Sequence, residues 1–330
     1  MSAAQSLVSL KHFLRGNAGC NLISGLAEIM TQLQKPPYVY MGGRIVDWDS
    51  ATIHVASEAL IRGISVFEGV KGYWRHDNSS LALLALQEHY ERLARSALLN
   101  QLPFSLSFQE FKDACVSLVR KLQARDRDLW LRPTIFATEG HWGEGTATDL
   151  VITCYHQEMK RPEPIDIGFT AWQRPLDSGL PSRIKSAANY QMGRLARIEG
   201  RQRGFSDMIL LNHWGRIAEA TGSCVLMVRS GRVATPPHYE GCLESITVDI
   251  VEALCRTLAI PFERRPIDRT ELMVADELCL AGTLMELGTV RRLDNRIMPP
   301  GTPVFDRIAD EFWAAVRGQR SHAAISLTPV

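Results

Sequence analysis

The sequence predicts a protein that mixes α-helices with β-strands and divides into two domains. Its 330 residues are more than twice the roughly 150 residues of a typical domain. Runs rich in β-branched and aromatic residues alternate with longer segments whose apolar residues recur at helical spacing. The first half of this alternation lacks the glycine spacing of a dinucleotide-binding fold. We therefore expect an α+β protein, with its domain boundary at a break in the alternation.

The N-terminal half begins with an extension, residues 1–36, that ends in the helix-breaking run Lys35-Pro36-Pro37. The first two expected strands flank Gly42-Gly43, a dipeptide that accepts the positive φ of a tight hairpin. The strands expected in this half span residues 38–41, 44–48, 66–74, 129–137 and 149–155. Two amphipathic helices are expected at residues 87–100 and 108–122.

A stretch interrupted by prolines marks the domain boundary. Residues 160–182 contain four prolines and one plausible strand, at residues 165–172. We expect a small N-terminal domain at residues 37–168, a linker at residues 169–182 and a larger C-terminal domain at residues 183–330.

The C-terminal domain repeats the mixture of strands and helices. Its expected strands span residues 207–211, 216–219, 224–228, 232–235 and 276–281. Its expected helices span residues 190–202, 245–258 and 305–316.

The overall charge excludes some classes of partner. The chain has 37 Lys and Arg against 36 Asp and Glu, a net charge of +1. Such a balance does not provide the excess of cations that binds nucleic acid or an anionic membrane surface. No run approaches the roughly 20 apolar residues that span a membrane. We expect no nucleic-acid or membrane partner.

The cysteines indicate a reducing compartment. The seven cysteines are an odd number, and they form neither a CxxC pair nor a metal-ligand spacing. They are typical of reduced, buried side chains in a cytoplasmic protein without a metal site. The N-terminus also lacks the apolar core and cleavage site of a secretion signal.

One lysine stands out among the cations. The chain has 30 arginines and seven lysines, and Lys185 is the last lysine, within Ser182-Arg183-Ile184-Lys185-Ser186. Only lysine can be deprotonated to attack a carbonyl. Lys185 is therefore either an ordinary surface lysine or a nucleophile for covalent chemistry.

Three further motifs could hold a phosphorylated pyridine cofactor. Glu219 ends a predicted strand, so it either caps the next turn or keeps a pyridine nitrogen protonated. Ser245 begins the best-defined helix, so it caps that helix, and the free amides there could also bind phosphate. The turn Gly282-Thr283 could serve the same anion or a carboxylate. Together with a lysine, these features suit pyridoxal 5′-phosphate (PLP).

Two arginines could bind a substrate. Arg132 lies inside the apolar run Leu129-Trp130-Leu131-Arg132-Pro133, where a cation is costly unless it is paired. Its partner is either a structural carboxylate or a substrate carboxylate. Arg62, within Leu60-Ile61-Arg62-Gly63, raises the same question.

The order of these motifs resembles the fold-type IV PLP enzymes, and most closely the branched-chain amino acid aminotransferases. The resemblance runs from Tyr38 to about Val290. It rests on GGRIVDWDSATIHVASEALIRGISVFEGVKGYW, EHYERLARSA, LWLRPTIF, KSAANYQMGRLARIEGRQRGFSDMILLN, AEATGS, ESITVDIVEAL and ADELCLAGTLMELGTV.

The resemblance implies an α+β fold of two domains, a homodimer or higher oligomer, and transfer of an amino group between glutamate and a 2-oxo acid. Lys185 would carry PLP and move the substrate proton. The other implied cofactor contacts are Tyr190 on the phenolic oxygen, Glu219 on the pyridine nitrogen, and Ser245, Ile246, Thr247 and Thr283 around the phosphate. The implied substrate contacts are Arg132 and Leu284 for carboxylates, and Phe67 and Trp172 as apolar walls.

Several positions depart from the family pattern. Gln87 stands where the resemblance implies an arginine on the phosphate, and Arg62 and Trp130 stand where tyrosines are usual. An arginine at position 62 suggests either a substrate with an additional acidic group or a replacement cation for the phosphate. Two PLP enzymes of the same fold, a lyase and a D-amino acid transaminase, and a non-catalytic relic are the alternatives. Leu131-Arg132-Pro133 and Phe67-Glu68-Gly69 favour the branched-chain type.

Overall fold

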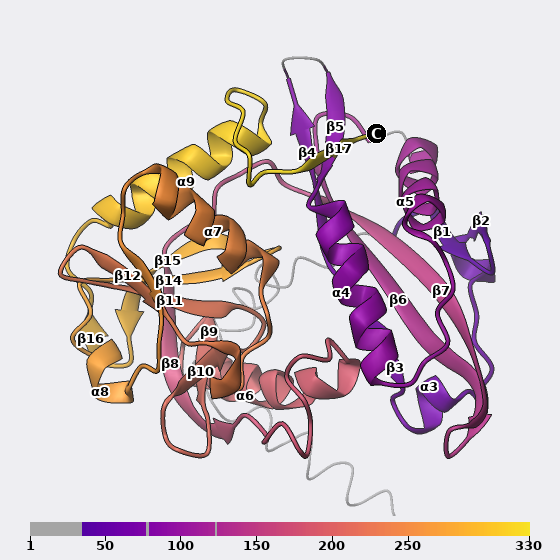
Figure 1. Ribbon diagram of the computed structural model, residues 1–330, viewed down its shortest axis with the longest axis horizontal. Helices are drawn as coiled ribbons and strands as arrows, with labels where there is room; N and C mark the ends of the chain where they lie inside the picture. The colour runs from indigo at the N-terminus through magenta and orange to yellow at the C-terminus, as the bar shows by residue number, and fades with distance from the viewer. Residues whose placement is uncertain (1–34, 77–78, 123) are drawn as a thin grey trace, which may run out of the picture. The chain divides into compact units, whose positions relative to one another are not determined.

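The computed structural model describes residues 35–76, 79–122 and 124–330 (Figure 1). Residues 36–330 form one compact unit. The expected extension at residues 1–36 lies almost wholly outside the described residues. No described helix is long and apolar enough to cross a membrane.

The first sheet is built mainly from the N-terminal half of the chain. Its strands run in the order β17-β5-β4-β6-β7-β1-β2, and β3 pairs with β6. Their bounds are β1 Tyr38–Met41, β2 Arg44–Asp47, β3 Ser65–Phe67, β4 Val70–Arg75, β5 Ser80–Leu84, β6 Asp128–His141, β7 Glu144–Gln157 and β17 Leu327–Pro329. The strands expected in this half are all present, although β3 and β4 divide the expected strand at residues 66–74.

The hairpin of β6 and β7 extends further than the sequence predicted. Both strands have 14 residues, and they are joined by Trp142 and Gly143 in left-handed conformations, with φ of 51° and 93°. The outer part of the hairpin is mostly exposed and lacks apolar alternation. Its pairing therefore depends on backbone hydrogen bonds, which the side-chain pattern does not encode.

Two helices of this half, α4 (Leu86–Leu99) and α5 (Phe108–Leu122), confirm the predicted amphipathic helices. Their apolar faces contribute Leu93, Phe111 and Leu118 to the core beside the sheet. A short helix, α3 (Glu58–Ile61), was not predicted.

The second sheet is built from the C-terminal half. Its strands run in the order β10-β9-β8-β15-β14-β11-β12-β13, and β16 pairs with β15. Their bounds are β8 Ile165–Gln173, β9 Asp207–Leu211, β10 Ile217–Ala220, β11 Cys224–Arg229, β12 Arg232–Thr235, β13 Phe262–Arg264, β14 Glu277–Gly282, β15 Glu286–Leu293 and β16 Arg296–Ile297. The parallel pairs β8 with β9 and β8 with β15 insert β8 into this sheet.

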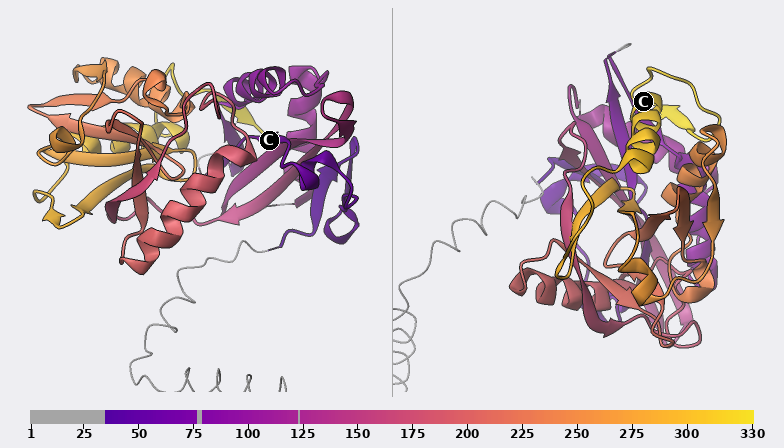
Figure 2. Two further views of the ribbon diagram at one scale, coloured as in Figure 1. Left: turned by 90° about the horizontal axis from the view of Figure 1, so that it is seen from below. Right: turned by 90° about the vertical axis from the view of Figure 1, so that its left-hand side faces the viewer.

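Helices cover the second sheet. The predicted helices are present as α6 (Tyr190–Gln202), α7 (Ile246–Thr257) and α9 (Pro303–Val316), and a short α8 (Arg269–Leu272) adds to them. Apolar residues of α7 and α9, including Leu254 and Phe312, pack in one core with Ala281 of β14. Figure 2 shows α6 in a different position, along the lower edge in the view from below. The remaining short helices are η1 Trp48–Ser50, η2 Ala187–Asn189 and η3 His238–Glu240.

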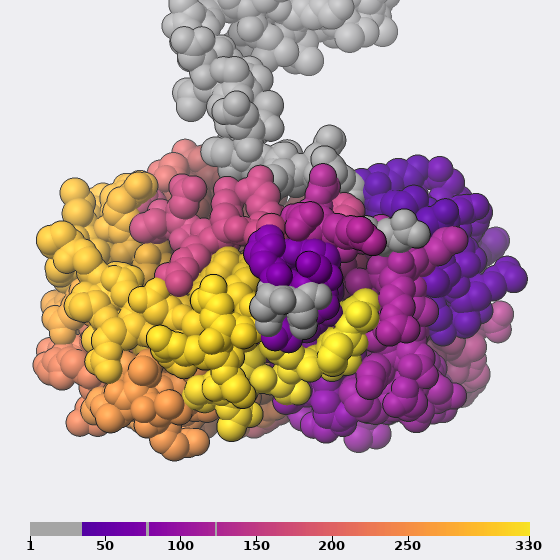
Figure 3. Space-filling model, turned by 90° about the horizontal axis from the view of Figure 1, so that it is seen from above, coloured from indigo at the N-terminus to yellow at the C-terminus, as the bar shows by residue number. Residues whose placement is uncertain are grey.

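The two sheets are tied to each other by chain crossings and by buried ion pairs. The C-terminal strand β17 returns to pair with β5, and Figure 3 shows this yellow segment lying over the surface beside the purple strands. Lys71 of β4 pairs with Glu286 of β15. Arg317, after α9, pairs with Asp128 of β6 at 2.6 Å. The chain passes from the first sheet to the second between β7 and β8. The division into two domains with a linker at residues 169–182 stays a prediction.

Candidate active site

Lys185 lies where the two halves of the chain meet. Its backbone carbonyl accepts a hydrogen bond from the amide of Phe67 at 2.9 Å, and its own amide donates to the Ser96 hydroxyl at 3.2 Å. The neighbouring Ser186 forms an isolated bridge with Val66. These contacts attach the lysine to β3 and to α4, so its position depends on the N-terminal half.

The side-chain amine of Lys185 donates to the phenolic oxygen of Tyr190 at 2.7 Å. This approach arises locally, because η2 turns the chain between the two residues. Ser186 caps η2 by accepting from the Asn189 amide at 3.4 Å, and α6 begins at Tyr190. The amine and the phenol that the resemblance assigned to one cofactor are therefore brought together.

An aromatic wall links the lysine to an arginine. The Phe67 ring lies 4.9 Å from the Tyr190 ring, and the Lys185 amine lies 5.2 Å from the Phe67 centroid. The Arg132 guanidinium lies 4.4 Å from the same centroid. No acidic side chain among the described residues pairs with Arg132, and burial lowers the pKa of its guanidinium despite the opposing effect of Tyr155. Arg132 is thus a partly buried cation suited to a ligand carboxylate.

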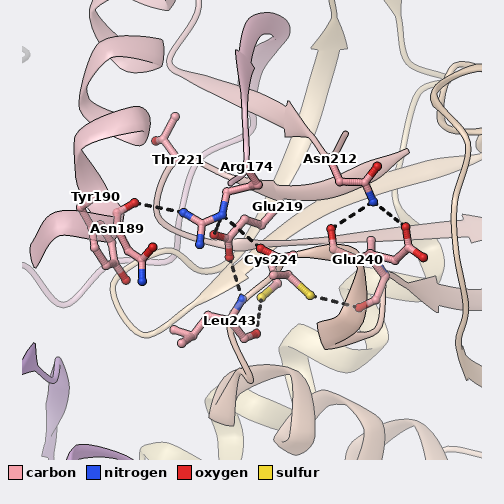
Figure 4. Close-up of polar contacts among 12 residues, drawn as sticks. Arg174, Asn189, Tyr190, Asn212, Glu219, Thr221, Cys224, Glu240 and Leu243 are labelled. Atoms are coloured by element: carbon pink, nitrogen blue, oxygen red, sulfur yellow. Dashed lines mark hydrogen bonds and ion pairs between the residues drawn. The ribbon is translucent and has the colours of Figure 1, made fainter. Parts of the chain in front are cut away.

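Glu219 lies on β10 and is held by two donors (Figure 4). One carboxylate oxygen lies 3.2 Å from Nε of Arg174, and the other accepts the Leu243 amide at 3.0 Å. The carboxylate is largely buried, with 14% of its side chain exposed. These two contacts fix the orientation of the Glu219 carboxylate.

The start of α7 presents backbone amides that the helix itself does not use. Ser245 caps the helix by accepting from the Val248 amide at 3.3 Å, which leaves the amides of Ile246 and Thr247 for another acceptor. A cavity of about 310 Å³ lies beside this turn, and Arg92 of α4 lines it.

Arg92 is fixed at this point by buried neighbours. Its guanidinium donates to both oxygens of Glu68, at 2.7 and 2.8 Å, and to the Glu244 carbonyl at 2.6 Å. His89 contacts Glu68 at 2.7 Å. Burial alone would raise the pKa of Glu68, but Arg92 and His89 outweigh it and hold that pKa well below the ordinary value. Burial also lowers the pKa of His89, which favours the neutral imidazole.

Gln87 does not reach this turn. Its amide donates to Glu91 at 2.8 Å on the exposed side of α4, and Gln87 does not line the cavity. Arg92, five residues further along α4, lines the cavity instead. The structure thus gives no support to the expectation that a neutral amide occupies the phosphate position.

The turn Thr283-Leu284-Met285 joins β14 to β15, closed by the pair Gly282 and Glu286. Gly282 packs closely on Ser223, because a β-carbon there would lie 3.3 Å from the β-carbon of Ser223. The Ser223 hydroxyl is buried and has no hydrogen-bond partner among the described residues. The turn that contains Thr283 therefore begins at a close contact between β14 and the residue before β11.

Two tryptophans of the expected pocket lie on different strands. Trp130 of β6 stacks against Tyr155 at 5.5 Å and contacts the backbone at Gly69. Trp172 of β8 is 40% exposed.

Gly193 lets α6 approach the loop before β11, since a β-carbon there would lie 2.5 Å from the Thr221 carbonyl.

Arg62 does not lie beside Arg132. It pairs with Glu58 one helical turn away, and its guanidinium lies 4.9 Å from the centroid of Trp142. The Ile64 carbonyl meets the Ala137 amide, five residues along β6 from Arg132, a separation of about 16 Å in an extended strand. Within this chain, Arg62 is separate from both Arg132 and the phosphate site.

The residues that the sequence analysis missed are Glu68, His89, Arg92 and Arg174. On α4, His89, Arg92 and Ser96 share one face at spacings of three and four, and all three are buried. Polar residues at this helical spacing could have been recognised in the sequence as one face of the helix. Arg174 follows a strand in a proline-rich stretch, and its sequence context gives no such signal.

Comparison with known proteins agrees with these observations. The family model for class IV amino-transferases matches residues 65–293. A probable branched-chain-amino-acid aminotransferase of Synechocystis is 32% identical, covering 82% of this chain and 90% of the relative.

Two solved structures are similar throughout. The PLP form of the Thermobaculum terrenum branched-chain amino acid aminotransferase has a TM-score of 0.82 and 32% identity, and the match covers 89% of this chain and 98% of that one. The branched-chain aminotransferase of the thermophilic archaeon Thermoproteus uzoniensis with norvaline has a TM-score of 0.83 and 30% identity, and the match covers 88% and 98%.

Proposed function

Because the chain belongs to the class IV aminotransferases, we propose that it transfers the amino group between L-glutamate and the 2-oxo acids of branched-chain amino acids. The chain is a PLP-dependent enzyme of the fold-type IV class. The observation that carries the proposal is the cluster of Lys185, Phe67 and Arg132, in which one aromatic ring lies between a reactive amine and an unpaired guanidinium.

The residues present fit PLP. The Lys185 amine, the Glu219 carboxylate and the first turn of α7 supply a nucleophile, a partner for a pyridinium and an anion site. We assign the phosphate to the Ile246 and Thr247 amides, to Arg92, which lines the cavity beside this turn, and to the Thr283 hydroxyl. When bound, PLP withdraws electrons from the substrate α-carbon.

Lys185 would carry the proton during the reaction. Its amine lies 2.7 Å from the Tyr190 oxygen, which limits the positions that the amine can adopt. An amine held in this way can accept the proton of the substrate α-carbon and return it to the cofactor side as a general base and acid. The Phe67 and Tyr190 rings, 4.9 Å apart, lie beside the amine.

Arg132 would receive the distal carboxylate of glutamate. The turn at Thr283 and Leu284 offers backbone amides to the α-carboxylate shared by both substrates. Phe67, Trp130 and Trp172 would contact the branched side chain of the second substrate. One pocket thus accepts an acidic and an apolar side chain, because a guanidinium lies at one end of an aromatic wall.

Arg62 and Gln87 are not included in this chain's own pocket. Arg62 is held by Glu58 and Trp142, and Gln87 by Glu91. We therefore favour ordinary branched-chain substrates over substrates with an additional acidic group.

A second copy of the chain is the partner that we propose, in a homodimer. Exposed apolar side chains gather around α3 and the β6–β7 tip, namely Ile53, Val55, Leu60, Ile61 and Trp142. A patch of this kind is typical of a subunit interface. We also propose a cytoplasmic location, since the cysteines of the described residues are buried and unpaired.

The substrate assignment is tested with a panel of 2-oxo acids and L-glutamate as the donor. We expect turnover of the 2-oxo acids of leucine, isoleucine and valine, with formation of 2-oxoglutarate. Turnover restricted to D-amino acids, or cleavage of a substrate without amino transfer, would contradict the proposal. Lys185→Ala provides the inactive control.

A further inference from the structure

Arg174 is a buried cation immediately after β8. Only 6% of the residue is exposed, and its backbone amide donates to the Leu211 carbonyl at 2.9 Å. A guanidinium in such a position must satisfy its donors within the protein. Its contacts therefore show what the side chain holds in place.

The guanidinium reaches three separate segments (Figure 4). Its Nη1 donates to the Asn189 carbonyl at 3.0 Å. Its Nε donates to the Gly241 carbonyl at 3.1 Å and lies 3.2 Å from a carboxylate oxygen of Glu219. Gly241 has a φ of +97°, and a β-carbon there would lie 3.4 Å from the β-carbon of Arg174. The loop thus packs directly on the arginine.

Each of these segments leads to one part of the proposed cofactor site. Asn189 precedes Tyr190, which binds the Lys185 amine. Glu219 is the proposed partner of the ring nitrogen. The loop from Gly241 continues to Leu243, whose amide holds the second oxygen of Glu219, and then to the start of α7.

We propose that Arg174 is a positioning residue that fixes the phenol, the carboxylate and the phosphate-binding turn relative to one another, so that all three meet one PLP molecule. This inference rests on the proposed function. Arg174 itself touches none of the reacting atoms. It acts by setting the orientation of the Glu219 carboxylate and the spacing of the segments at residues 189–190 and 241–246.

The geometry requires arginine rather than any cation. A guanidinium presents several donors in a rigid plane, whereas the amine of lysine is a single point at the end of a flexible chain. Lysine at this position could retain the ion pair with Glu219, but it could not also reach the carbonyls of Asn189 and Gly241. Substitution of Arg174 by lysine therefore separates the contribution of its charge from that of its geometry.

The test compares Arg174→Lys and Arg174→Gln with the wild-type protein. We measure the dissociation constant of PLP by quenching of tryptophan fluorescence, and the visible circular dichroism of bound PLP, which reports its orientation. We expect affinity to fall about 10- to 100-fold in both variants, the loss that follows removal of a hydrogen bond to a charged group. We also expect a reduced dichroism signal per bound cofactor in both.

Arg203→Gln is the matched control. Arg203 also donates to a backbone carbonyl, that of Phe169 at 2.7 Å, and to an acid, Glu199 at 2.8 Å, but it holds none of the three segments. We expect this variant to keep wild-type PLP affinity and dichroism. Thermal unfolding of each protein without PLP is measured in parallel.

Two outcomes would overturn the inference. One is wild-type affinity and dichroism in both Arg174 variants, even if their unfolding temperatures fall. The other is full recovery of both properties in Arg174→Lys, which would show that charge alone is sufficient. If the wild-type protein itself binds no PLP at Lys185, the proposed function fails instead, so the two failures are distinguishable.

Discussion

The reactivity of the site depends on how single side chains are held. Lys185 is restrained by Tyr190, and Arg132 is stacked on Phe67 without an acidic partner among the described residues. A cation left in this state is costly unless a ligand supplies the missing charge. Arg132 is therefore the residue whose substitution should separate the two substrates.

Replacing Arg132 with methionine should weaken the use of glutamate selectively. The side chain keeps its apolar contact with Phe67 but loses the partner of the distal carboxylate. Since a charge-assisted hydrogen bond contributes about 1.5–3 kcal/mol, kcat/KM for 2-oxoglutarate should fall about 10- to 100-fold. The value for the 2-oxo acid of leucine should change little, as measured by steady-state kinetics. Equal losses for both substrates would contradict the assignment.

Sequence reasoning proposed Lys185, Glu219 and Arg132 from the chemistry of those residue types, and the resemblance added Tyr190; the structure brings the Lys185 amine and the Tyr190 phenol together. It placed the neutral amide of Gln87 at the phosphate, whereas Arg92 and not Gln87 lines the cavity beside α7. The two positions are five residues apart, which turns them by about 140° around a helix of 3.6 residues per turn. One side chain faces solvent and the other the site, a distinction that depends on which face of α4 is buried.

Elements carry the binding groups into position, and α7 is the clearest case. The Ser245 hydroxyl fixes the first turn by accepting from the Val248 amide. That turn presents the amides proposed for the phosphate. The cap should therefore affect both the stability of the fold and the affinity for PLP.

Ser245→Ala should destabilise the protein by about 1 kcal/mol and also weaken PLP binding severalfold. Ser107→Ala is a matched control, because Ser107 accepts from the Glu110 amide at the start of α5, on the exposed surface. It should lower the free energy of unfolding without changing the PLP dissociation constant. Urea unfolding and fluorescence titration measure the two quantities. Loss of PLP affinity in the control would show that instability alone explains the effect.

The predicted elements are present where one face is apolar, and strands of both sheets, among them β5 and β15, were missed. The helices α4, α5, α6, α7 and α9 match their expected positions. Strand β5 was missed because its apolar run continues directly into α4, with only Ala85 at a φ of 51° between them. Strand β15 was missed because its alternation is interrupted by the charged pair Arg291-Arg292.

At the scale of the whole molecule, buried charges join the two halves. Glu68 lies in the first half and holds Arg92, which in turn donates to the Glu244 carbonyl before α7. The sequence predicted domains at residues 37–168 and 183–330 but no contact between them. The hydrogen bond from Arg92 to Glu244 joins residues more than 150 positions apart, and local sequence patterns do not reveal such pairs. Their presence makes the stability of the fold sensitive to acid.

Glu68 determines whether stability rises or falls with pH, because its pKa is lower in the folded protein than its ordinary value of 4.5. A lowered pKa contributes stability that is complete above the unfolded value and is lost as the pH falls toward the folded value. The free energy of unfolding should therefore decline below about pH 5. Glu68→Gln should be less stable at pH 7 and show a flatter decline, as measured by urea unfolding across pH.

Glu158→Gln is the control for this decline, because Glu158 pairs with Lys160 on the exposed surface. It should follow the wild-type curve. A Glu68→Gln protein with the same acid dependence as the wild type would exclude Glu68 as the source.

Reduction of the PLP-loaded protein with borohydride, followed by peptide mapping, shows which lysine carries PLP. We predict a single phosphopyridoxyl adduct on Lys185, which lies on the peptide that contains Tyr190. An adduct on another lysine, or no adduct at all, would exclude Lys185 as the residue that carries PLP.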